Sequence, residues 1–228
     1  MGRVKLSFLR HAKVPSHEGD MPLTEDSRAD IDAAVPRLRA LAGEGDRFLF
    51  LATRTHRSRQ TAEALRTAID PGAPAVEPAW GLRNPDLYLA GERVEMMSKP
   101  EAIAGQFTPR PMTAEMVSSQ PFFHGFFASP DRIEYWLTHE TPPGENAAAV
   151  ARRVLQFAHS FAYSVEGDMV VACLSHSPVQ RAIVVQGLGL EDPGEPGWAE
   201  AIEMTVSETG LTYAFRGQEG VLRPSFLS

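Results

Sequence analysis

The stretch Val4-Lys5-Leu6-Ser7-Phe8-Leu9-Arg10-His11 decides the fold, because a short apolar run ends there on an arginine and a histidine. Residues 4–9 have the length and composition of a buried β-strand. Two later runs, Phe48–Leu51 and Met169–Leu174, have the same character, and polar residues follow each of them. The sequence therefore predicts three buried strands that carry polar residues at their carboxyl ends.

Amphipathic segments separate these strands. A helix is predicted after Thr24, whose hydroxyl suits an N-cap, and a second over Arg57–Ile69. A long helix around Val150–Phe161 precedes the third strand, and another helix follows it from Ser177 to Gly187. Strands that alternate with helices predict an α/β domain with a mostly parallel central sheet. Two further strands, expected as a hairpin, are predicted over residues 201–207 and 211–215.

The segment from Asn84 to Pro143 breaks this regularity. It is rich in proline and holds the aromatic cluster Phe122–Phe127. We expect one domain over residues 1–228, with residues 84–143 forming an insertion of short helices and loops. The apolar cluster would be the core of that insertion or a wall over the site.

The composition excludes several classes of protein. The chain has 228 residues, of which 43% are hydrophobic and 22% charged, as in globular proteins. A net charge of −7 argues against a general nucleic-acid binder. The single cysteine, Cys173, excludes an intramolecular disulfide and a zinc site of the CxxC type. No run of residues is long and apolar enough for a signal peptide or a membrane span, so we expect a cytoplasmic protein.

In α/β sheets, ligands bind beyond the carboxyl ends of the strands. Those ends would bring together Arg10-His11, residues 53–57 and Ser175-His176-Ser177. Arginine forks suit a phosphate or a carboxylate. A histidine that is neutral on one ring nitrogen can attack phosphorus, and a second histidine can stabilise the transferring oxygens. A carboxylic acid nearby would protonate the leaving oxygen.

These residues carry a resemblance to a known family. Leu9-Arg10-His11-Ala12 resembles the Leu-Arg-His-Gly signature of the histidine phosphatase superfamily, which has the phosphoglycerate mutase-like fold. Ala12 replaces the usual glycine, as in the SixA-like branch. Further similar motifs follow in the family's order over residues 4–187: Pro22-Leu23-Thr24, Arg57–Leu65, Pro142–Glu145 and Leu174–Ser177. The resemblance implies a three-layer α/β/α sandwich with a lid insertion.

The resemblance also implies roles for individual residues. His11 would be the nucleophile that becomes phosphorylated, and His176 the second histidine of the phosphate pocket. Arg10 and Arg57 would hold the phosphate. Ser177 would add a hydroxyl or a backbone N–H at the start of its helix.

Two positions depart from the family pattern. His17 stands where many members have a phosphate-contacting asparagine, and we place it among the phosphate-binding residues. Asn84 stands where many members have a glutamate that acts as the proton donor. Asp86, two residues on, is the best candidate for that acid. Glu77, Glu140 or the substrate itself are the alternatives.

The leading prediction is a phosphomonoester hydrolase that acts through a phosphohistidine on a small phosphorylated metabolite. No metal and no cofactor are expected, because the arginines and histidines supply the positive charge. Phosphoglycerate mutase-type transfer and a catalytically weak phospholigand-binding module are the alternatives. Neither nucleic acid nor a membrane is expected as a partner. A homodimer is left open.

Overall fold

The computed structural model describes residues 2–108 and 110–222; the remainder of the predicted domain, residues 1, 109 and 223–228, lies outside the described residues. The described chain contains a seven-stranded sheet in the order β3-β2-β6-β1-β7-β8-β9. The strands β3, β2, β6 and β1 are parallel, and β7, β8 and β9 continue the sheet in antiparallel pairs. Their bounds are β1 Val4–Arg10, β2 Arg47–Ala52, β3 Glu77–Pro78, β6 Met169–Ser175, β7 Ala201–Ser207, β8 Gly210–Phe215 and β9 Gln218–Leu222.

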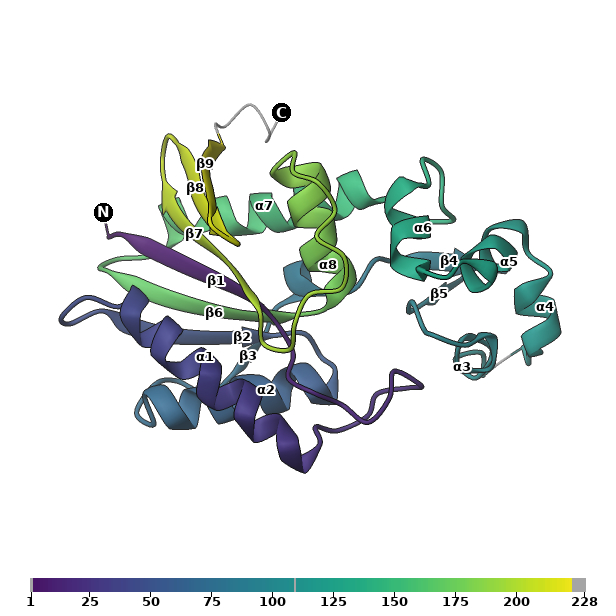
Figure 1. Cartoon of the computed structure of the whole chain (residues 1–228), viewed down its shortest axis with the longest axis horizontal. Coiled ribbons are helices and arrows are strands. Elements are labelled where there is room, and N and C mark those ends of the chain that lie inside the picture. The colour runs from purple at the N-terminus through teal and green to yellow at the C-terminus, as the bar shows by residue number, and fades with distance from the viewer. Residues whose placement is uncertain (1, 109, 223–228) are drawn as a thin grey trace.

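Helices cover both faces of this sheet (Figure 1). The helices α1 (Arg28–Leu41) and α2 (His56–Ile69) lie on one face, and α7 (Ala147–Ser164) and α8 (Ser177–Ala182) lie on the other. Side chains alternate across β1, so Leu6 and Phe8 join the apolar core under α7, whereas Leu9 joins the core under α1 and α2. The predicted α/β fold with a mostly parallel central sheet is confirmed.

Residues between β3 and α7 form a group of short elements beside the carboxyl ends of the parallel strands (Figure 1). After a 3₁₀ turn at Trp80–Leu82 they comprise a small hairpin, β4 (Leu87–Leu89) and β5 (Glu92–Val94), and four helices, α3 (Pro100–Ala104), α4 (Ala114–Ser118), α5 (Pro121–Ala128) and α6 (Arg132–Thr138). Phe122, Phe123 and Phe126 are buried on α5. The aromatic cluster therefore packs inside this insertion, and its buried residues join the same apolar core as Leu6 and Phe8.

Several local predictions differ from the structure. The predicted helix from Ser177 to Gly187 is an α-helix only over Ser177–Ala182 and continues as a π-helix over Ile183–Gly187, with His176 at the N-cap position. The insertion contains the β4–β5 hairpin, which its proline content conceals. The edge strands β3 and β9 were not predicted. β3 has only two residues, and β9 exposes most of its side chains, so neither shows an apolar alternation.

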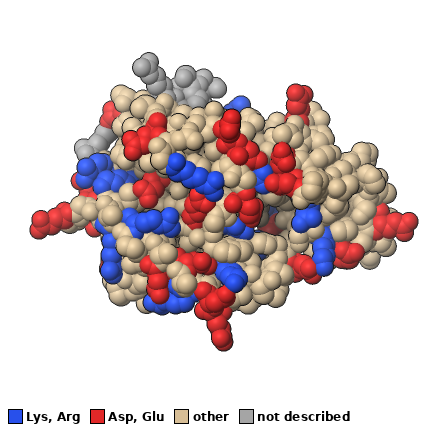
Figure 2. Space-filling model, viewed as in Figure 1, with Lys and Arg blue, Asp and Glu red and all other residues tan. Residues whose placement is uncertain are grey.

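The described surface mixes charges of both signs. Figure 2 shows lysine and arginine side chains interspersed with aspartate and glutamate side chains over one face. Across the described ranges, no helix is both long enough and apolar enough to span a bilayer.

Candidate active site

The ends of three parallel strands place the predicted histidines and arginines together. Arg10 is the last residue of β1, and its register partner on β6 is Ser175. His11 and His176 therefore lie side by side, with ring centroids 5.4 Å apart. Arg57, in the first turn of α2 after β2, lines the same cleft as His11.

His11 is held as a neutral base. Its Nδ1 lies 2.8 Å from the carbonyl oxygen of Ala12, and since a carbonyl only accepts, Nδ1 carries the proton and donates it. Nε2 then keeps a free lone pair. Burial lowers the pKa of His11 to about 2, against the opposing hydrogen bond to Ala12, and the charges of Arg57 and Arg10 lower it further. An uncharged imidazole nitrogen of this kind is suited to attack phosphorus.

His176 is also held neutral. Complete burial lowers its pKa well below the ordinary value, and the nearby Arg57 adds to this effect. Its Nε2 lies 3.0 Å from the hydroxyl of Thr53, which in turn lies 3.1 Å from the hydroxyl of Thr55. Its Nδ1 is buried without a hydrogen-bond partner among the described residues. The ring is thus fixed on one side and keeps one nitrogen available.

The two arginines of the cluster are buried and incompletely bonded. Arg10 is 4% exposed and Arg57 is 5% exposed. The Nε of each has no hydrogen-bond partner within residues 2–108 and 110–222. Arg57 makes two long contacts of 3.4 Å, to the carbonyl oxygen of Gly19 and to a carboxylate oxygen of Asp20. Buried cationic donors without partners are unfavourable, so these two groups favour an anionic ligand.

The segment Glu195–Trp198 completes the cluster, and sequence reasoning missed it. Arg10 donates from Nη2 to Glu195 at 2.6 Å and from Nη1 to the carbonyl oxygen of Pro196. The ring of Trp198 lies 3.8 Å from the Arg10 guanidinium carbon and stacks on His17 at 5.8 Å. The position of this segment follows from the sheet, because β7 pairs antiparallel with β1. Residues directly before β7 must therefore lie beside the carboxyl end of β1.

Ser177 and His17 lie at the cluster as well. The hydroxyl of Ser177 donates to the second carboxylate oxygen of Glu195 at 2.6 Å. The rings of His17 and His11 are 5.7 Å apart. Burial lowers the pKa of His17, and the charges of Arg10 and Arg57 act in the same direction. Both residues line the cleft that holds His11.

This cleft has a volume of about 380 Å³, within the range of small-molecule sites. The insertion forms its outer wall with Met96, Met97, Phe126, Pro130 and Ile133, and with the polar residues Ser98, Asp131 and Arg132. Asn84 lies at its base, where its side-chain oxygen is buried without a partner among the described residues. A smaller neighbouring cleft of about 180 Å³ also includes Asn84 and His176.

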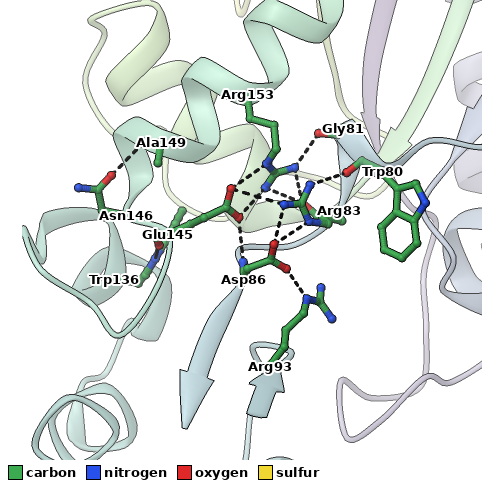
Figure 3. A network of polar contacts seen from close by, with 10 residues as sticks. All are labelled: Trp80, Gly81, Arg83, Asp86, Arg93, Trp136, Glu145, Asn146, Ala149 and Arg153. Atoms are coloured by element: carbon green, nitrogen blue, oxygen red, sulfur yellow. Dashed lines mark hydrogen bonds and ion pairs between the residues drawn. The ribbon is translucent and has the colours of Figure 1, made fainter. Parts of the chain in front are cut away.

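Asp86 does not lie in this cluster. Its carboxylate accepts hydrogen bonds from Arg83, at 2.5 and 2.9 Å, and from Arg93 (Figure 3). Partial burial opposes ionisation, but the two arginines hold the pKa of Asp86 below its ordinary value. Asp86 lines neither cleft. A doubly paired, ionised carboxylate has no proton to give, so this placement argues against Asp86 as the acid.

The alternative acids are no better placed. Glu77 is exposed on the edge strand β3, and Glu140 is exposed before α7. Neither residue lines either cleft. Within the described ranges, no group of three or more histidine, cysteine, aspartate or glutamate side chains is arranged to hold a metal ion.

The segment before β7 is tied to the insertion by Arg181. This residue of α8 is 1% exposed and pairs with two carboxylates. One is Asp192, at the start of the loop that carries Glu195; the other is Asp131, which caps α6 of the insertion. The insertion and the loop that carries Glu195 both line the cleft, and the buried guanidinium of Arg181 therefore links them.

Comparison of the structure with solved structures identifies the fold. YhfR from Bacillus stearothermophilus superposes with a TM-score of 0.60 at 17% identity, over 94% of this chain and 97% of that chain. A mycobacterial glucosyl-3-phosphoglycerate phosphatase gives 0.55 at 16% identity, over 96% and 97%. A variant of phosphoserine phosphatase from Entamoeba histolytica, solved with phosphoserine, gives 0.53 at 14% identity, over 96% and 94%.

No protein-family model matches the sequence, and no curated protein matches it significantly. The similar structures are members of the histidine phosphatase superfamily. At these identities the comparison shows the fold. The chain therefore has the phosphoglycerate mutase-like fold of histidine phosphatases, as its motifs predict.

Proposed function

We propose that this chain is a phosphomonoester hydrolase that works through a phosphohistidine on His11. One observation carries the proposal: a neutral His11 with a free Nε2 lies beside two buried arginines that each keep an unused Nε–H. Phosphatases with the same fold support it. A cytoplasmic location stays a prediction from the sequence.

The first step transfers the phosphoryl group to the protein. A bond forms between Nε2 of His11 and phosphorus while the bond from phosphorus to the leaving oxygen breaks. Arg10, Arg57 and His176 stabilise the three remaining oxygens, which carry the charge in the transition state. Water then attacks the phosphohistidine, the nitrogen–phosphorus bond breaks, and inorganic phosphate leaves.

The shape of the cleft supports a small substrate. Five apolar side chains of the insertion face the volume beyond His11, with Arg132 as the cation of the outer wall. Such a wall suits a phosphomonoester with a partly apolar body better than a heavily phosphorylated one, which needs many cations. We propose that the insertion acts as the lid that selects this substrate.

One observation favours a second candidate, a phospholigand-binding module with little turnover. Asn84 replaces the acid of the family pattern at the base of the cleft, so an alkoxide leaving group lacks a donor there. A mutase-type transfer needs proton transfer in both directions, and the same replacement disfavours it.

Phosphate release from nitrophenyl phosphate tests the proposal. Wild-type protein should turn over in the presence of EDTA, and quenching at alkaline pH should trap an acid-labile, base-stable phosphohistidine at position 11. His11→Ala should lower turnover on the order of 10⁶-fold, as for covalent nucleophiles in other enzymes. His124→Ala, an exposed histidine of α5, is the matched control.

The outcomes separate the candidates. Phosphate or vanadate binding without turnover would identify the ligand-binding module. Interconversion of phosphoglycerates without net phosphate release would identify the mutase. Near wild-type turnover by His11→Ala, or strict dependence on added Mg²⁺ or Zn²⁺, would overturn the phosphohistidine mechanism.

A further inference from the structure

The structure offers a carboxyl group that the family pattern does not supply. We propose that Glu195 is the proton donor to the leaving oxygen, an inference that rests on the phosphohydrolase function proposed above. Glu195 lines the same cleft as His11 and His176, and its side chain is 53% exposed. It is therefore open to a substrate, unlike the paired Asp86.

The contacts of Glu195 place it where a phosphate would bind. Its two carboxylate oxygens accept from Arg10 Nη2 and from the Ser177 hydroxyl, each at 2.6 Å. Both donors belong to the predicted phosphate pocket. A phosphoryl group that binds Arg10 and Ser177 must take these donors from Glu195 and leave the carboxylate next to the substrate.

The other carboxylates on the two clefts are engaged elsewhere. Asp131 accepts from two backbone N–H groups at the start of α6 and from Arg181. Both oxygens of Asp20 accept from the backbone N–H of His56 at 2.9 Å. Glu95 pairs with Arg93 at 3.6 Å. Asp20 also contacts a predicted phosphate-binding group, Arg57, but only at 3.4 Å, whereas both contacts of Glu195 to such groups are 2.6 Å long.

This exchange of partners frees Glu195 to carry a proton to the leaving oxygen. In the free protein, the carboxylate of Glu195 is paired with Arg10 and accepts from Ser177. Once the phosphoryl group has taken Arg10 and Ser177, the carboxylate loses its cation and faces a like charge. The carboxyl group of Glu195 is then free to share a proton with the leaving oxygen. Substrate binding thus converts Glu195 from an anionic partner of Arg10 into an acid beside the reacting group.

The proton can be followed through both steps. As Nε2 of His11 bonds to phosphorus and the ester bond breaks, the Glu195 carboxyl passes its proton to the leaving oxygen, which departs as an alcohol. The resulting carboxylate then accepts a proton from the attacking water as the oxygen–phosphorus bond forms and the phosphohistidine bond breaks. Glu195 returns to its protonated state at the end of the cycle.

Leaving-group dependence tests this role. Glu195→Gln keeps the size of the side chain and an oxygen that accepts from Arg10, but it removes the acid. Its kcat/KM should fall by roughly 10²–10⁴ with an alkyl phosphate, the range for general acid catalysis, and stay near wild type with nitrophenyl phosphate. Glu191→Gln, an exposed carboxylate in the same loop, is the matched control. Asp86→Asn tests the sequence-based alternative in the same assay.

Each outcome has a distinct meaning. The alkyl-to-nitrophenyl ratio does not depend on the fraction of folded protein, so a destabilised variant still answers the question. An unchanged ratio in Glu195→Gln, or faster turnover of both substrates, would make Glu195 a competing anion and overturn its role as the acid. A changed ratio in Asp86→Asn alone would assign the acid to Asp86. A wild type that is inactive on every phosphomonoester would instead overturn the proposed function.

Discussion

Two regions of this molecule gather arginines away from solvent, partly buried in one and fully buried in the other, and the two regions differ in how these arginines are paired. At the base of the insertion, Arg153 donates to both oxygens of Glu145 and to the carbonyl oxygens of Gly81 and Arg83 (Figure 3). At the strand ends, Arg57 has two long contacts and an Nε with no partner in the described part of the chain.

The pairing of the arginines distinguishes a region that supports the fold from a region that is suited to bind an anion. Glu145 also accepts from the backbone N–H of Asp86, and its carbonyl oxygen accepts from the Trp136 indole. This network joins the insertion to α7 with its charges paired. The strand-end cluster keeps buried donors without partners among the described residues, beside the cleft that holds His11, and such donors favour an anionic ligand.

The largest effect on stability should come from the paired region. Arg153→Ala removes two of the hydrogen bonds to Glu145 and the side-chain donor to two carbonyl oxygens, so it should lower the free energy of unfolding by about 3 kcal/mol. Denaturant titration measures this change. Arg152→Ala, an exposed neighbour on α7, should cost little. If Arg153→Ala were as stable as Arg152→Ala, the network would not support the fold.

The opposite pattern is expected at the strand ends. Arg57→Ala should lower kcat/KM for a phosphomonoester by roughly 10²–10³, the usual cost of losing one group that stabilises transition-state charge. Stability should stay level or rise, since a buried cation that makes only long contacts to Gly19 and Asp20 is removed. Arg59→Ala on the exposed face of α2 is the control. Equal losses of stability in Arg57→Ala and Arg153→Ala would erase the distinction between the two regions.

A smaller effect concerns pH and the neutral His11. The folded protein holds the pKa of His11 at about 2, whereas the unfolded chain protonates this histidine near 6.5. Protons therefore favour unfolding below about pH 6.5. Between pH 7.5 and 5.5, wild type should lose about 1.4 kcal/mol more unfolding free energy than His11→Ala. Unfolding curves at the two pH values measure the difference, and identical pH slopes would mean that His11 is protonated in the folded state.

The sequence predicted the parts of the site that short local patterns encode. Apolar runs located β1, β2 and β6, and the polar residues directly after them include His11, Arg57 and His176. Because parallel strands end at the same edge of a sheet, the predicted strands were enough to place His11, Arg57 and His176 together. Their chemical roles stay predictions.

The sequence did not predict the parts that depend on long-range packing. Glu195 and Trp198 lie in a loop whose glycines and prolines give no periodic signal, and their position follows from the pairing of β7 with β1. Asp86 was chosen because it is near Asn84 in the chain. The ion pairs that Asp86 makes depend on Arg93, across the β4–β5 hairpin, which the sequence did not reveal.

The position of β1 in the sheet has a consequence for how the chain folds during synthesis. β1 leaves the ribosome first, but both of its neighbours are C-terminal: β6 is paired with it at a separation of 165 residues, and β7 is later still. At about 5–20 residues per second, that apolar strand waits on the order of 10–30 s for its first partner. Such non-local pairing slows folding and exposes an unpaired strand to aggregation. His11, the proposed nucleophile, therefore follows directly on the strand that waits longest for a partner, and its surroundings are among the last features of the molecule to form.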